Sequence, residues 1–288
     1  MTLFFKTLLR PHNSVYYQGR LMKALTRIPI FSYNTMVTTL VTDSKSLEIK
    51  FRKKFITLES LFELESILTW CASHPEVQSI CISVYGDHFL QGIDPEELKT
   101  MSEDMLTKIL MKLAVISQSI FCLPQTVIMD LKLGTKGIGL ELALAADIRL
   151  AREEAVFSFN HLTSGLTPTC GMFSFLTPYL NQNVMRSLIL SGKEFNVQTM
   201  NALGGWCDTD LNANTIVKQI FAQAPVARMQ AKRGLLGTNF TKEIDPKIEV
   251  ERKIFNAAMA TMDYTQNNPF MSHTEFKEKL QDRVERLG

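Results

Sequence analysis

The sequence predicts an α/β fold followed by a mainly helical region, and two observations support this prediction. In the first half of the chain, short segments rich in apolar and β-branched residues alternate with longer segments whose apolar residues recur at helical spacing. Such alternation is typical of proteins with a largely parallel sheet covered by helices. After residue 170, nearly every segment has helical spacing, so we expect helices to make up the last third of the chain.

The first predicted elements are two strands, a helix and a third strand. Residues 36–42 and 47–51 alternate in polarity or run β-branched, as strands do. Between residues 57 and 74 the apolar residues lie on one face of a helix, which Pro75 ends. Residues 77–84 are strongly apolar and therefore predict a buried strand.

The next elements continue the alternation. One helix is expected to follow Pro95 with a continuous apolar face as far as Ile116, and residues 126–131 then supply another buried strand. A short helix begins near Gly137. Two strands follow it at 147–151 and 155–159, and the sequence then predicts helices at 172–180, 183–191, 196–204, 211–222, 225–236, 243–263 and 273–286.

The composition is that of a globular protein that needs no covalent or metal staple. The 288 residues are 45% hydrophobic and 21% charged, and a chain of this length can bury a substantial core. The net charge of +2 is too small to indicate nucleic acid as the main partner. The five cysteines show no C-x-x-C spacing, so they predict neither a zinc site nor a redox motif. No apolar run reaches the roughly 18 residues of a membrane span, and we expect a cytoplasmic protein.

The N-terminus has a distinct charge pattern. No acidic residue precedes Asp43, whereas basic residues recur throughout this stretch. A transit peptide has this acid-poor character, which would target the protein to an organelle. Pro11 and Pro29 interrupt any long amphipathic helix, however, and so favour a plain basic extension.

Two glycine-containing turns come at the carboxyl ends of predicted buried strands. One covers residues 88–94 and the other residues 134–141. Ligands of open α/β sheets bind at this end of the strands. A glycine turn that opens a helix leaves backbone N–H groups unpaired, and two such turns can direct two amides at one developing oxyanion. The same glycines also suit ordinary tight turns, so the turns alone do not decide between these interpretations.

Four segments in one register resemble the enoyl-CoA hydratase/isomerase (crotonase) family. The longest begins Gly137-Ile-Gly-Leu-Glu-Leu-Ala-Leu-Ala-Ala-Asp and ends Gly165-Leu-Thr-Pro-Thr-Cys-Gly171. Upstream, Phe89-Leu-Gln-Gly-Ile-Asp94 resembles the family's first oxyanion-hole loop. Downstream, Leu190-Ser-Gly-Lys-Glu-Phe-Asn and Ala224-Pro-Val-Ala-Arg-Met-Gln-Ala-Lys-Arg-Gly resemble its later segments. The likeness spans roughly residues 45–265, which makes it far more specific than any single motif.

The resemblance implies a fold, an assembly and a ligand. The fold is a crotonase-like spiral of ββα units with a C-terminal helical region that drives trimers, often paired into hexamers. On this basis residues 1–35 are a basic N-terminal extension, 36–205 the α/β core and 206–288 the helical trimerisation region. The ligand is an acyl-CoA thioester, or alternatively an acyl-carrier-protein thioester. Coenzyme A is then part of the substrate, and no separate cofactor or metal is expected.

The resemblance also assigns residues to an oxyanion hole. Its two amides belong to Ile93 and Ile138, while Gly92, Asp94, Gly137 and Gly139 form the substrate-binding loops around them. Lys232 is a candidate for contacting the phosphates of coenzyme A, although the end of an amphipathic helix is also an ordinary solvated surface.

Glu141 lies where the hydratases of this family place one of two catalytic glutamates, and first-turn glutamates also stabilise helix dipoles. The second glutamate is expected 20 residues later, where this sequence has His161. Imidazole can donate or accept a proton near neutral pH. His161 therefore either replaces the missing acid or is an ordinary polar residue at a site that has lost hydration activity.

Other departures leave two classes of function open. Lys132 and Lys136 replace the usual approach to the second loop, and Cys170 replaces a small residue in the later glycine turn. His88 lies near the first loop as a surface turn residue or a further acid/base group. The chain is thus either an acyl-CoA enzyme (hydratase, isomerase, decarboxylase or hydrolase) or an inactive subunit that binds acyl-CoA.

Overall fold

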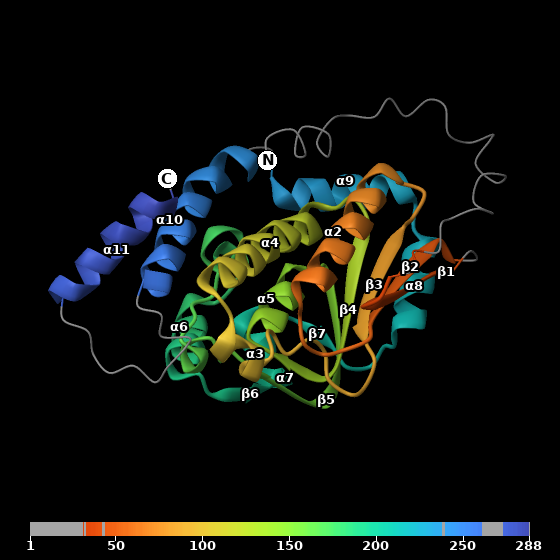
Figure 1. Cartoon of the computed structure of the whole chain (residues 1–288). Coiled ribbons are helices and arrows are strands. Elements are labelled where there is room, and N and C mark those ends of the chain that lie inside the picture. Colours follow the sequence, from red (N-terminus) through yellow and green to blue (C-terminus); the bar gives the residue numbers. More distant parts are fainter. Residues whose placement is uncertain (1–30, 32, 42–43, 238–239, 261–272, 288) are drawn as a thin grey trace.

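The computed structural model describes all residues except 1–30, 32, 42–43, 238–239, 261–272 and 288. Most of the predicted N-terminal extension therefore lies outside the described residues. Within the described part, a seven-stranded sheet has the order β1-β2-β3-β4-β5-β6, with β7 paired to β5 (Figure 1). The strands are β1 Met36–Val41, β2 Ser46–Phe51, β3 Ser79–Val84, β4 Thr126–Lys136, β5 Ile148–Ser158, β6 Glu194–Asn196 and β7 Cys207–Asp208.

The centre of the sheet is parallel, as predicted. Strands β2, β3, β4 and β5 pair in parallel, whereas β1 and β6 pair antiparallel to their neighbours. The carboxyl ends of β3 and β4 consequently lie at the same edge, and both glycine turns begin there.

Strands β4 and β5 are longer than the sequence predicted. Strand β4 continues to Lys136 instead of ending near 131, and the two strands expected at 147–151 and 155–159 are one strand, β5. Register shifts between Asp130 and Lys132, and between Lys132 and Gly134, interrupt their pairing. Bulges of this kind let a strand accommodate residues that break the alternating pattern, which is why the pattern suggested an earlier end.

The helices that precede the site begin at side-chain caps. Helix α2 (Leu58–Ser73) has a capping box formed by Thr57 and Ser60. The single helix expected after Pro95 is instead two helices, α3 (Pro95–Thr100) and α4 (Glu103–Cys122). The break occurs because the Ser102 side chain accepts a hydrogen bond from the Met105 amide and so starts a new helix.

Helices α2, α4 and α5 (Ile138–Ala145) cover one face of the sheet and enclose the main hydrophobic core with it (Figure 1). Helix α8 (Ala213–Ala222) packs on β3 and β4 from the other side, over a second cluster that includes Ile128 and Ile220. By length and composition α4 is apolar enough to cross a membrane, but half of the relevant window is buried inside the protein, as in a core helix.

The chain after residue 170 is mainly helical, as predicted. A π-helical turn at Met172–Leu176 and a 3-10 turn at Thr177–Tyr179 replace the helix expected at 172–180. The short strands β6 and β7 were not predicted. The remaining helices are α6 Gln182–Ser191, α7 Val197–Leu203, α9 Pro225–Leu236, α10 Phe240–Ala260 and α11 His273–Leu287.

Candidate active site

The two glycine turns pack directly against each other. The Phe89 amide donates to the Gly134 carbonyl at 3.0 Å, and the Thr135 hydroxyl donates to the Leu90 carbonyl at 2.5 Å. A Cβ atom placed on Gly139 would lie only 2.0 Å from the Leu90 carbonyl oxygen. Position 139 therefore needs glycine so that the two turns can approach each other this closely.

The residues predicted to form the oxyanion hole lie at this junction. Ile93 and Ile138 are both buried, and Ile138 is the first residue of α5. A Cβ atom placed on Gly92 would lie 3.9 Å from the Ile138 amide nitrogen, so the two loops meet at these residues. That the amides of Ile93 and Ile138 form an oxyanion hole stays a prediction. Asp94 caps α3 by accepting a hydrogen bond from the Glu96 amide at 2.9 Å. Its carboxylate thus has a structural task, and a role in binding substrate stays a prediction.

Glu141 and His161 form a buried pair. Glu141 lies in the first turn of α5, every residue of which is buried, and its side chain is fully enclosed. His161 is 3% exposed, and its Nε2 lies 2.7 Å from Glu141 Oε1. Gly137 leaves room for the Asn160 side chain next to this pair, because a Cβ atom there would approach the Asn160 side-chain oxygen to 2.6 Å. The structure therefore brings together the two residues predicted to be catalytic.

The two ring nitrogens of His161 differ in their contacts with the described residues. Because a carboxylate only accepts, Nε2 is the nitrogen that carries the proton in the contact with Glu141. Its other ring nitrogen, Nδ1, is buried and makes no hydrogen bond to any described residue. In the tautomer with the proton on Nε2, Nδ1 holds an unused lone pair, which is the arrangement of a general base oriented by a carboxylate.

A third group holds the other oxygen of Glu141. The Cys170 amide donates to Glu141 Oε2 at 2.9 Å. Burial raises the pKa of the Cys170 thiol well above its usual range, and the nearby charges of Glu141 and Glu251 raise it further. Cys170 therefore contributes its backbone amide to the site, while its thiol stays protonated and unreactive at neutral pH.

The sequence model of the enoyl-CoA hydratase/isomerase family matches residues 46–286 of this chain. This match covers far more than half of the sequence. The chain belongs to the enoyl-CoA hydratase/isomerase family. Similar relatives include the human mitochondrial enoyl-CoA hydratase domain-containing protein 2, which is 27% identical over 205 residues, or 66% of this chain and 67% of that protein. A short-chain-enoyl-CoA hydratase of Clostridioides difficile is 25% identical over 134 residues, or 43% of this chain and 84% of that protein.

Solved structures of family members share the fold. The enoyl-CoA hydratase of Bacillus halodurans superposes with a TM-score of 0.68 at 21% identity, over 86% of this chain and 99% of that one. An enoyl-CoA hydratase/isomerase from Xanthobacter autotrophicus Py2 gives a TM-score of 0.69 at 17% identity, over 88% of this chain and 97% of that one. The predicted crotonase-like α/β fold with C-terminal helices is thereby confirmed.

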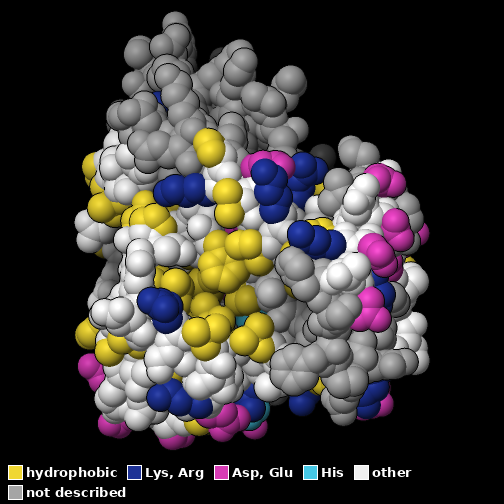
Figure 2. Space-filling model, turned by 90° about the vertical axis from the view of Figure 1, so that its left-hand side faces the viewer, with side chains coloured by type: hydrophobic (Ala, Val, Ile, Leu, Met, Phe, Trp, Pro, Cys, Tyr) yellow, Lys and Arg dark blue, Asp and Glu magenta, His cyan; other side chains and the backbone are white. Residues whose placement is uncertain are grey.

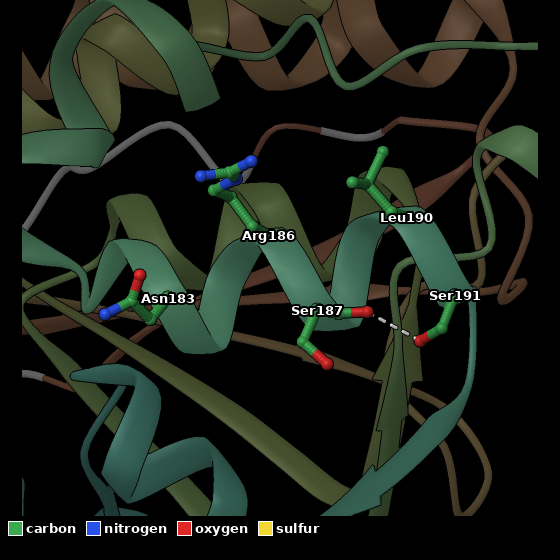
Figure 3. Close-up of a pocket in the computed structure, with 5 residues that line it drawn as sticks. All are labelled: Asn183, Arg186, Ser187, Leu190 and Ser191. Atoms are coloured by element: carbon green, nitrogen blue, oxygen red, sulfur yellow. Dashed lines mark hydrogen bonds between the residues drawn. The ribbon is translucent and has the colours of Figure 1, made fainter.

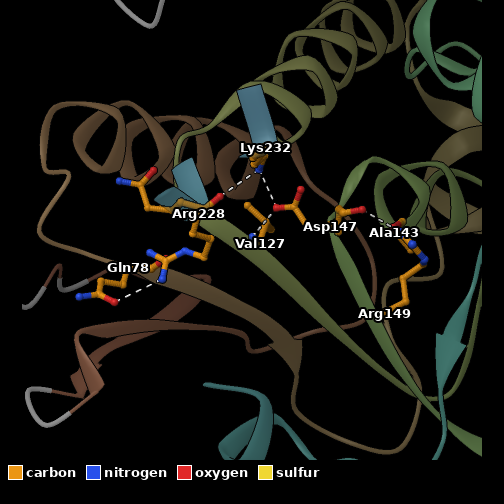
Figure 4. A network of polar contacts seen from close by, with 9 residues as sticks. Gln78, Val127, Ala143, Asp147, Arg149, Arg228 and Lys232 are labelled. Atoms are coloured by element: carbon orange, nitrogen blue, oxygen red, sulfur yellow. Dashed lines mark hydrogen bonds and ion pairs between the residues drawn. The ribbon is translucent and has the colours of Figure 1, made fainter. Parts of the chain in front are cut away.

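Lys232 is not at the site, contrary to the suggestion that it contacts phosphates there. Its ammonium group donates to Asp147 at 2.6 Å and to the Gln125 carbonyl at 2.9 Å. Gln125 immediately precedes β4 and Asp147 immediately precedes β5, so Lys232 lies at the amino ends of these strands. The glycine turns follow the carboxyl ends. Figure 4 shows the lysine reaching down from α9 to Asp147, beside Arg228 and Gln78. Lys232 is thus held by partners within its own chain and its side chain is only 11% exposed, so it is neither the phosphate contact that the resemblance suggested nor an ordinary solvated surface residue.

The other basic residues that depart from the family pattern, Lys132 and Lys136, also have partners close by in the structure. Lys132 donates to the carbonyls of Val84 at 2.7 Å and Gly86 at 2.5 Å, and so holds the start of the first loop. Lys136 pairs with Glu194. His88 is exposed, in keeping with a surface turn residue. In the part of the chain that the structure describes, no group of His, Cys, Asp and Glu side chains is placed to hold a metal ion.

An open depression on α6 is separate from the site. It has a volume of 490 Å³ and is lined by Asn183, Arg186, Ser187, Leu190 and Ser191. Figure 3 shows all five side chains on successive turns of this one helix. No predicted site residue lines the depression.

Sequence reasoning missed one residue near the site, Glu251 on α10. It accepts hydrogen bonds from the Gly171 and Ser174 amides at 2.8 and 2.9 Å. Burial raises its pKa to about 7 against the lowering effect of these hydrogen bonds. The signal was present in the sequence, because Glu251 shares a helical face with the apolar residues Ile248 and Phe255. A carboxylate in that position is buried only when it has partners.

Proposed function

We propose that this protein is an acyl-CoA enzyme that forms a thioester enolate, with His161 as the proton-transfer group. The observation that carries the proposal is the enclosed Glu141–His161 pair with its unpaired Nδ1. In this mechanism the thioester oxygen accepts hydrogen bonds from the amides of Ile93 and Ile138. These amides stabilise the negative charge that develops as the α-carbon loses or gains a proton.

The geometry favours a division of labour within the pair. Nδ1 of His161 takes a proton, and Glu141 orients the ring and stabilises the imidazolium that forms. Glu141 is thus the supporting group rather than the primary acid/base. A single imidazole can remove a proton from one carbon and return it to another, which is the chemistry of a double-bond shift. Hydration additionally needs a water molecule placed at the β-carbon, so we rank isomerisation first and hydration second.

Two features of the surface suit an acyl-CoA ligand. Figure 2 shows hydrophobic side chains gathered around a hollow, with Lys and Arg side chains near its rim, on the face where α6 and α10 lie in Figure 1. Three exposed basic residues, Arg52, Lys53 and Lys54, precede α2. Their segment is hydrogen-bonded to the first loop, because the Gln91 amide donates to the Lys54 carbonyl at 2.8 Å. They are candidates for contacting the phosphates of coenzyme A.

The test is a pair of assays on the purified protein. Crotonyl-CoA reports hydration by loss of the conjugated thioester absorbance, and a 3-enoyl-CoA reports isomerisation by its gain. We expect His161→Ala to lower kcat by roughly 10²–10⁴-fold, the range for removing a general base. Glu141→Gln should lower it as well, because the amide no longer stabilises the imidazolium. His88→Ala is the matched control, since this exposed histidine should leave kcat unchanged.

Two outcomes would count against the mechanism. Wild-type turnover that survives His161→Ala would remove His161 from the chemistry. Tight binding of acyl-CoA without turnover of either substrate would favour the inactive binding subunit instead. In that event His161→Glu, which restores the paired glutamates of the hydratases, asks whether the rest of the site is competent.

A further inference from the structure

A carboxylate far along the chain holds the turn that contacts the catalytic pair. Glu251 lies on α10 and is 5% exposed. Its two oxygens accept hydrogen bonds from Gly171 N and Ser174 N, which belong to the start of the π-helical turn. Amides at the start of a helical turn have no partner within that turn, so Glu251 caps it from a different helix.

The same turn supplies the contact to Glu141. The Cys170 amide, which donates to Glu141 Oε2 at 2.9 Å, immediately precedes the Gly171 amide that donates to Glu251. Two consecutive peptide groups therefore point at two different buried carboxylates. The two peptide groups share the Cα atom of Cys170, so a change in the orientation of one displaces the other wherever the surrounding backbone cannot compensate.

The turn has little freedom to adjust by itself. Gly171 has φ of 93°, and a Cβ atom there would lie 2.1 Å from the Phe175 ring. The backbone is thus packed against its own side chains in a conformation that favours glycine. Its direction is set by what holds its amides, and on the α10 side that is Glu251.

We propose that Glu251 is a positioning residue. It docks α10 against the π-helical turn and thereby aims the amide of Cys170, which lies just before that turn, at Glu141. This inference rests on the proposed function for its catalytic consequence, but the coupling itself is a statement about structure. Helix α10 then takes part in arranging the site without touching the substrate. A displacement of about 1 Å in such a supporting contact can cost roughly 100-fold in rate.

The experiment uses the full chain with Glu251→Leu and Glu251→Gln. Leucine removes both acceptors, whereas glutamine keeps one acceptor oxygen for the two amides. We expect Glu251→Leu to lower kcat by at least roughly ten-fold while KM changes less than about three-fold, and Glu251→Gln to recover part of the loss. Glu249→Gln is the matched control, because Glu249 lies on the same helix, is exposed and pairs with Arg252.

A second readout is independent of turnover. The protein is labelled with ¹⁵N-cysteine, and the Cys170 amide resonance is assigned by its loss in Cys170→Ser. In Glu251→Leu this resonance should shift, while those of Cys71 and Cys81 in the core stay in place. If Glu251→Leu fails to fold, Glu251→Gln provides the same comparison with a smaller expected shift.

The outcomes separate the two proposals. An unchanged Cys170 resonance, or a loss confined to KM, overturns the positioning role of Glu251. A shifted resonance in a protein that turns over no acyl-CoA supports the coupling and overturns the proposed function alone.

Discussion

At the residue scale, Glu141 satisfies two buried donors that have no other partner in the described structure. Replacing it with leucine leaves the His161 ring N–H and the Cys170 amide buried and unpaired. An unsatisfied buried donor costs about 1–3 kcal/mol, so Glu141→Leu should lower the free energy of unfolding by about 3 kcal/mol, measured by urea denaturation. The double variant Glu141→Leu/His161→Leu should be less destabilised than the sum of the single variants, because it removes one orphaned donor. Strict additivity would show that the pair is not coupled.

At the same scale, the raised pKa of Glu251 leads to a prediction about how the stability of the fold depends on pH. Burial raises the pKa of its carboxyl from 4.5 to about 7 in the folded protein. Between these two pH values the folded state binds more protons at Glu251 than the unfolded state does. Its contribution to stability is therefore greatest below pH 4.5 and is lost as pH rises through 7. From pH 5 to pH 8 the loss amounts to about 2.5 kcal/mol.

The measurement compares wild type with Glu251→Gln, whose side chain does not titrate. The difference in the free energy of unfolding, wild type minus variant, should fall by about 2.5 kcal/mol between pH 5 and pH 8. Titrations that both proteins share cancel in this difference. Glu249→Gln should show no such trend relative to wild type. A difference that does not change with pH would mean that Glu251 ionises in the folded protein much as it does in the unfolded chain.

At the scale of elements, the first loop depends on a lysine of the neighbouring strand. Lys132 has φ of 52° at the bulge in β4 and donates to two carbonyls at the end of β3. Lys132→Met removes both hydrogen bonds and should lower the free energy of unfolding by roughly 1–2 kcal/mol, with a matching fall in Tm. Lys136→Met is the control, because its exposed ion pair with Glu194 is worth at most about 1 kcal/mol. Equal effects of the two substitutions would contradict the role of Lys132.

The same scale shows where sequence reasoning works and where it stops. Strands, helices and the two glycine turns follow from local periodicity, and the spacing from Glu141 to His161 identified a pair that the fold brings into contact. The helix break at Ser102 was missed because one side-chain cap outweighs a continuous apolar face. The Cys170 amide and Glu251 were missed for a different reason. Their partners are 29 and about 80 residues away, so the apolar face that marks Glu251 as buried does not say which backbone amides it accepts from, and the Cys170 amide itself carries no residue-type signal.

At the scale of the whole molecule, the two edges of the parallel sheet have different tasks. The glycine turns, Glu141 and His161 gather beyond the carboxyl ends of the strands. At the amino ends, Lys232 and Arg228 fasten α9 to the residues that precede β4, β5 and β3 (Figure 4). The polar contacts of α9 therefore face the sheet, and no residue of this helix is buried within the chain. Of its large apolar side chains, Met229 and Leu236 are partly covered by the described residues, whereas Val226 and Leu235 stay exposed.

This exposed face leads to a prediction about assembly. Val226 is 58% exposed and Leu235 is 80% exposed on α9, and the family resemblance implies a trimer or hexamer built by the C-terminal helices. We expect sedimentation to give a mass of at least three times the 32.7 kDa of one chain. The double variant Val226→Glu/Leu235→Glu should shift it toward the single-chain mass, because burying two carboxylates in an apolar interface is costly. Phe62→Glu, at a 54% exposed position on α2, is the comparison. If Phe62→Glu dissociates the assembly and the α9 variant does not, the interface lies on the α2 side of the molecule.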